Sequence, residues 1–101
     1  MGHDKILDSR GKEIILDIKL HPGEVLADEL AARNLVKSAF AMKIGMYPGH
    51  FSDILKGRRN ISAAIALKLE KELSISAEFW LGLQVDYDLQ VERDKISPRA
   101  A

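Results

Sequence analysis

The spacing of apolar and glycine residues in the middle of the chain strongly limits the folds it can adopt. Two short helical patterns, residues 37–44 and 48–56, flank a turn at Gly45, where Gly takes a left-handed backbone without strain. The pattern comprises Phe40, Ala41, Ile44, Gly45, Phe51, Ile54, Leu55 and Gly57. Helices that cross steeply must touch closely, and Ala41 provides the small side chain needed there. This spacing predicts a helix-turn-helix.

The second helix of this motif is predicted to read DNA. When Phe51, Ile54 and Leu55 face the core, the opposite side of the helix is free to enter a major groove. The residues expected to read bases there are Tyr47, Gly49, His50, Ser52 and Asp53. A helical hairpin without a DNA role is the alternative interpretation of the same pattern.

Basic residues gather around the motif. Residues 33–60 hold six Lys or Arg and one acid, a net charge of +5, whereas the whole chain is neutral and the remainder therefore carries −5. Such asymmetry is typical of a local DNA-binding surface, although a solvated basic face would look the same. We expect the phosphate ligands to be Lys37, Lys56, Arg58, Arg59 and Asn60.

Three further helices are predicted, which makes the chain all-α with five helices. Pro22 suits a first helical turn, and Asn34 is expected to end that helix. Ser62 and Ser76 stand where N-cap residues are expected, before patterns at 63–73 and at 77 to about 92. His21, which precedes a Pro-Gly turn, is interpreted as structural and not as a metal ligand.

The two ends of the chain have different patterns. In residues 1–20, Ile-rich runs flank a turn with Gly11, which indicates a β-hairpin or an unpaired arm. Residues 21–96 are predicted to form the helix-turn-helix domain, whose last helix serves dimerisation, and residues 97–101 a frayed tail.

The apolar residues of the fifth helix favour a dimer. Leu81, Leu83, Val85 and Leu89 cannot all face one side of a helix, so some are left for a twofold partner. We expect the dimer interface to contain Trp80, Leu83 and Tyr87. Such a dimer would place two reading helices about 34 Å apart, one turn of DNA.

Several other classes of protein find no support in the sequence. The chain has no Cys, which excludes disulfides and Cys-based metal sites, and its three His are not spaced as a ligand set. The sequence shows no set of residues typical of a catalytic site, so we expect no enzyme activity, no metal site and no cofactor. No apolar run approaches the roughly 20 residues that span a bilayer, and a cytoplasmic protein without membrane contact is predicted.

Three blocks of sequence carry a resemblance to a known family. They are His21-Pro22-Gly23-Glu24-Val25-Leu26, Leu55-Lys56-Gly57-Arg58-Arg59-Asn60-Ile61-Ser62, and Phe79-Trp80-Leu81-Gly82-Leu83-Gln84 with Tyr87-Asp88. Residues 21–88 resemble the HigA/VapI branch of the Xre helix-turn-helix family, antitoxins of bacterial toxin–antitoxin pairs. The resemblance implies a five-helix, lambda-repressor-like fold and a homodimer on an inverted-repeat operator. It also implies a HigB/RelE-like, mRNA-cleaving toxin as partner and repression of the shared operon.

Two alternatives to an antitoxin remain at this point: a stand-alone Xre-type regulator without a toxin, and a protein-interaction module that has lost DNA binding. The start of the reading helix departs from the family, because Pro48 has no donor and Gly49 has no side chain. We therefore expect affinity to come mainly from the phosphate ligands, with the helix contributing discrimination between sequences.

Overall fold

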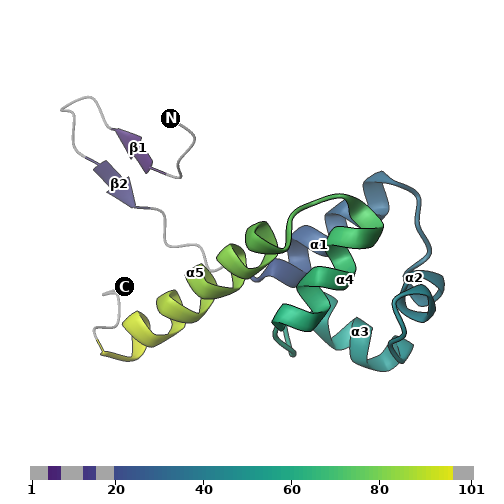
Figure 1. The fold of residues 1–101 in the computed structure, drawn as a ribbon. Helices are drawn as coiled ribbons and strands as arrows, with labels where there is room; N and C mark the ends of the chain where they lie inside the picture. Colours follow the sequence, from purple (N-terminus) through teal and green to yellow (C-terminus); the bar gives the residue numbers. More distant parts are fainter. Residues whose placement is uncertain (1–4, 8–12, 16–19, 97–101) are drawn as a thin grey trace.

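The computed structural model describes residues 5–7, 13–15 and 20–96 of the 101-residue chain. The described part contains five helices, as predicted. They are α1 (Pro22–Ala32), α2 (Lys37–Lys43), α3 (Pro48–Leu55), α4 (Ala63–Leu73) and α5 (Ala77–Ile96). Figure 1 shows α1 to α4 gathered into one body, while α5 starts against that body and extends beyond it.

Local chemistry explains where the helices begin and end. Ser62 caps α4, since its Oγ accepts a 3.2 Å hydrogen bond from the Ile65 N–H. Gly45 and Gly57 follow α2 and α3 with φ of 74° and 78°, the left-handed conformation expected at these two turns. Helix α5 runs past the predicted end near residue 92 to Ile96, because Arg93 and Lys95 suit the negative end of the helix dipole.

The core lies where these helices meet. Phe40 of α2 and Phe51 of α3 contact each other with ring centroids 5.6 Å apart, and Ala41 is fully buried at the crossing as predicted. Helix α4 packs on α5, and α1 packs on both α3 and α5. The buried apolar residues are Leu26, Leu30, Phe40, Ala41, Ile44, Phe51, Ile54, Leu55, Ile61, Ala66, Leu69, Leu73, Ala77 and Trp80.

Two short strands precede the helices. Strand β1 (Lys5–Leu7) pairs antiparallel with β2 (Glu13–Ile15), with Ile6 opposite Ile14. This pairing agrees with the hairpin alternative for the N-terminal segment. The rest of that predicted segment, and the tail predicted as frayed at 97–101, lie outside the described residues.

Candidate nucleic-acid interface

Helix α3 presents one face to the core and one to solvent. Phe51, Ile54 and Leu55 are buried and fix the helix against α1 and α2. On the other side, three of the five predicted base-reading residues, Tyr47, Gly49 and His50, are exposed, while Ser52 and Asp53 are half-buried. The structure therefore places all five along one short helix and its N-cap, with the greatest exposure at the N-terminal end.

The exposed start of α3 combines two polar rings with an open backbone. Tyr47 is 76% exposed, and its ring meets that of His50 edge-on with centroids 5.8 Å apart. A Cβ added to Gly49 would meet nothing within 4 Å, so the backbone there is open to a close approach. The surface offers a phenol and an imidazole as hydrogen-bonding groups, both capable of contacting base edges.

Asp53 contacts both arginines of the following loop. Its Oδ1 lies 3.9 Å from Nη1 of Arg58, and its Oδ2 lies 3.8 Å from Nε of Arg59. The main-chain carbonyl of Asp53 also accepts hydrogen bonds from the N–H groups of Arg58 and Arg59, at 2.7 and 3.2 Å. The long, exposed ion pairs contribute little to stability, but they keep the two guanidinium groups next to the end of α3.

The loop between α3 and α4 carries four of the five predicted phosphate ligands. Lys56, Arg58, Arg59 and Asn60 are all exposed there. The fifth ligand, Lys37, is exposed at the first residue of α2. The structure thus groups a cluster of cations and one amide directly after the candidate reading helix.

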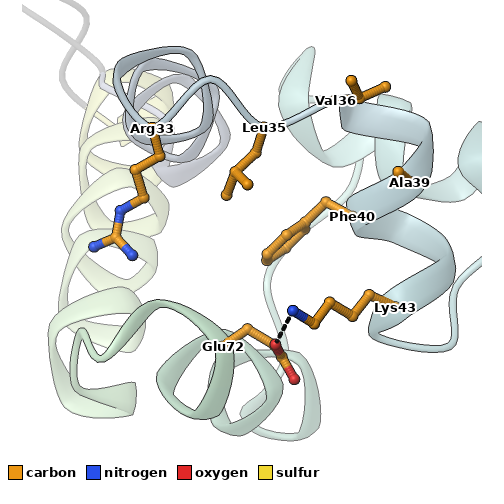
Figure 2. A pocket seen from close by; sticks show the side chains of 7 residues that line it. All are labelled: Arg33, Leu35, Val36, Ala39, Phe40, Lys43 and Glu72. Carbon is orange, nitrogen blue, oxygen red and sulfur yellow. Dashed lines mark ion pairs between the residues drawn. The ribbon is translucent and has the colours of Figure 1, made fainter.

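A groove opens between the end of α1, α2 and the end of α4. It has a volume of about 270 Å³ and is lined by Arg33, Leu35, Val36, Ala39, Phe40, Lys43 and Glu72. Figure 2 shows the side chains of Leu35 and Phe40 pointing into it, while Lys43 reaches across to Glu72 at 3.2 Å. Because its lining comes from the α1–α2 segment, α2 and α4, it is distinct from the α3 surface.

The predicted dimer residues are placed differently from expectation. Trp80 is fully buried in the core of a single chain, so the prediction that it contacts a partner is corrected: its side chain has no free surface. Leu83 is half-buried against the same core, and the ring of Tyr87 packs edge-on against His21 with centroids 4.8 Å apart. All three are used within the chain because α5 packs on α4 and α1 through this side.

A different side of α5 is apolar and open. Val85 and Leu89 are one helical turn apart and 53% and 43% exposed, and Ile96 lies two turns further on. We call these three residues the α5 stripe. The sequence shows that apolar residues surround α5, but only its packing on α4 and α1 shows which side remains free. Only Trp80 is therefore withdrawn from the predicted dimer contact, and the half-buried Leu83 and Tyr87 stay predictions.

The described ranges hold neither a membrane-spanning helix nor a metal cluster. No helix there is both long and apolar enough to cross a bilayer. No group of three or more His, Cys, Asp or Glu side chains in these ranges is placed to hold a metal ion.

Comparison with known proteins identifies the family. No protein-family model matches the chain. Virulence-associated protein I of Dichelobacter nodosus is 36% identical over 80 residues, which are 77% of this chain and 74% of that protein. An addiction module antidote protein of a HigA family from Coxiella burnetii has a TM-score of 0.72 and 36% identity, over 76% of this chain and 85% of its own. The chain belongs to the HigA/VapI-type antitoxins of the Xre helix-turn-helix family.

A HigA structure has also been solved with DNA. The Pseudomonas aeruginosa antitoxin HigA, solved with the higBA promoter, has a TM-score of 0.73 and 30% identity, over 83% of this chain and 97% of its own. The likeness covers nearly that whole antitoxin. The helix-turn-helix described above is therefore shared with a relative whose structure includes promoter DNA.

The three blocks that resemble the HigA/VapI family have definite roles in this member. Residues 21–24 form a capping box at the start of α1. The Nδ1 atom of His21 accepts a hydrogen bond from the Gly23 N–H, and the carboxylate of Glu24 accepts one from the His21 N–H. Residues 55–62 form the end of α3, the basic loop and the cap of α4. Residues 79–88 lie within α5, where Gln84 binds Ile61 of the second block and Tyr87 contacts His21 of the first block.

Proposed function

We propose that this chain is a DNA-binding antitoxin that represses its own toxin–antitoxin operon by binding an inverted-repeat operator. The observation that carries the proposal is the placement of an exposed reading face on α3 directly before a loop with exposed Arg58 and Arg59. The HigA relative whose structure includes promoter DNA supports the same use of this fold.

The division of labour on the surface follows from its charges. His50 and Tyr47 offer ring hydrogen-bonding groups, whereas Lys37, Lys56, Arg58 and Arg59 offer cations. Phosphate contacts position a protein on DNA, and base contacts specify sequence. The loop therefore provides affinity, and α3 provides discrimination.

The α5 stripe is the proposed homodimer contact. A second copy would cover Val85, Leu89 and Ile96 and would remove this apolar surface from water. A twofold arrangement lets the same patch meet itself, which is the commonest form of dimer. Two reading helices related in this way match an inverted repeat.

The finer proposal concerns the toxin. As a HigA/VapI-type antitoxin, the chain is proposed to neutralise a HigB/RelE-like, mRNA-cleaving toxin encoded beside it. The groove into which Leu35 and Phe40 point has a partly apolar lining, and it is the proposed contact for this partner protein.

The test combines co-purification with footprinting. The product of the adjacent gene should co-purify with this chain and lose its mRNA-cleaving activity in the complex. A footprint of the region upstream of the gene should show a protected inverted repeat. If the operator is protected but no toxin co-purifies, the chain is a stand-alone regulator. If a toxin co-purifies but no operator is protected, the DNA-binding proposal is wrong.

A further inference from the structure

His21 lies where four parts of the domain meet. Its side chain is only 2% exposed, and its ring packs against Tyr87 of α5. A Cβ on Gly57, at the start of the basic loop, would lie 3.5 Å from Cγ of His21, so the loop backbone also packs on the ring. Gly23, two residues along, lies against the carbonyl of Ile54 at the end of α3. The ring therefore contacts the basic loop and α5 at the start of α1, and Gly23 beside it packs on the end of α3.

The hydrogen bonding of the ring requires its neutral form. Nδ1 accepts a buried 2.9 Å hydrogen bond from the backbone N–H of Gly23, so in the native structure Nδ1 carries no proton. The proton of the neutral ring is then on Nε2, which makes no hydrogen bond of good geometry within the described residues. A second proton on Nδ1 would face the Gly23 N–H and place positive charge at the positive end of the α1 dipole.

The surroundings of the ring oppose its charged form on balance. Burial lowers the pKa of His21 below its ordinary value. Asn60 in the loop, Glu24 in α1 and Asp88 in α5 raise the pKa and offset part of this effect. With Tyr87, these are the polar and charged groups that the packed elements direct at the ring.

We propose that His21 makes the DNA-binding surface sensitive to acid: a proton on Nδ1 breaks the cap of α1 and loosens the packing of the basic loop on the ring, which lowers operator affinity. The inference rests on the proposed DNA binding and adds a regulatory input to it. Because Arg58 and Arg59 sit on this loop next to Gly57, its displacement moves the main phosphate ligands.

A second histidine lies on the proposed DNA-binding surface. His50 is exposed on α3, so its contribution to DNA binding has to be separated from that of His21. The experiment therefore uses His50→Gln as its background. Within it, His21→Asn is the decisive variant, because the Asn oxygen can accept the Gly23 N–H as an N-cap and does not titrate between about pH 5 and 8.

Operator affinity is measured by fluorescence anisotropy at constant salt from about pH 7.5 to about pH 5, the range in which His changes charge. In His50→Gln, we expect affinity to fall below the His21 pKa by up to about tenfold for each pH unit, the limit for uptake of one proton. In His21→Asn/His50→Gln, affinity should stay constant. An equal fall in both proteins would overturn the proposal.

A measurement without DNA separates this inference from the proposed function. In the unmodified chain, NMR should show the amide signals of Gly57 and Ile61 shifting with the same midpoint as the His21 ring signals. Amides that stay still while the ring titrates would overturn the inference, even if His21→Asn fails to fold. Absence of operator binding at neutral pH, with coupled amide shifts intact, would instead count against the proposed function alone.

Discussion

The backbone N–H of Ile61 donates a buried 2.7 Å hydrogen bond to Oε1 of Gln84, across 23 residues of sequence. Gln84 is 5% exposed, and its Nε2 donates in turn to Oδ1 of Asp88 at 2.9 Å. This pair fixes the end of the basic loop to α5. Gln84 therefore connects the surface proposed to face DNA with the helix proposed to face a second copy.

Replacing Gln84 by Leu should destabilise the fold by about 1–3 kcal/mol, because the buried N–H of Ile61 loses its partner. Urea unfolding followed by circular dichroism measures the change. Gln90→Leu is the matched control on the same helix: its side chain bonds to Asp94 of α5 itself, and the expected change is within about 0.5 kcal/mol. Equal effects of the two variants would contradict the role given to the Ile61–Gln84 pair.

The two Pro-Gly pairs that open α1 and α3 give a second matched comparison. A Cβ on Gly23 would overlap the carbonyl oxygen of Ile54, whereas a Cβ on Gly49 would stand in open space. Gly23→Ala should therefore cost about 3 kcal/mol or more, since backbone cannot move aside cheaply. Gly49→Ala should leave the free energy of unfolding within about 0.5 kcal/mol of the original. A small effect at Gly23 would show that α1 and α3 can separate at little cost in stability.

The sequence predicts the features that depend on local spacing and misses those that depend on packing. The helix-turn-helix and the Ser62 cap follow from patterns only a few residues long, and the structure has both. The buried side of α5 could not be predicted, because its apolar residues surround the helix. The contact of His21 with Tyr87 joins residues 66 positions apart, and no local pattern encodes such a pair.

The pairing of Asp53 with the loop arginines also depends on packing and was not predicted from the sequence. Its carboxylate was expected to face a base, and the structure instead places it within 4 Å of Arg58 and Arg59. The three residues meet only because Gly57 reverses the chain after α3. Its role in reading bases stays a prediction, and in the free protein it has a second role as partner of the arginines.

Arg58 and Arg59 are predicted to bind phosphate. Changing either to Ala should weaken binding to operator and unrelated DNA alike. It should also reduce the slope of log affinity against log salt by about 0.9 for each phosphate that the variant no longer neutralises. Anisotropy titrations over a range of salt measure both effects. Lys95→Ala, near the far end of α5, is the control and should leave the slope unchanged. A slope unaltered in both arginine variants would remove the loop from the interface.

Asp53 and His50 are predicted to affect which sequence is bound. Asp53→Asn removes a negative charge beside the arginines, so overall affinity should rise. A preference for cytosine at the contacted position should also move towards adenine, whose edge suits an amide. His50→Ala should change the preferred sequence and leave the salt slope intact at neutral pH. Selection of bound sequences from a random pool measures both preferences, and an unchanged preference in both variants would place the reading face elsewhere.

The α5 stripe is predicted to hold the dimer together. Leu89→Glu places a charge at an apolar contact, and a twofold interface contains this change twice, so the dimer should separate. Light scattering should then give half the original mass at protein concentrations where the unmodified chain is a dimer. Operator affinity should fall at least about tenfold, because each half-site is then bound without the advantage of linkage. Leu67→Glu, on exposed α4 surface, is the control and should stay dimeric. An unmodified chain that is monomeric, or a Leu89→Glu chain that stays dimeric, would show that the stripe is not the contact between copies.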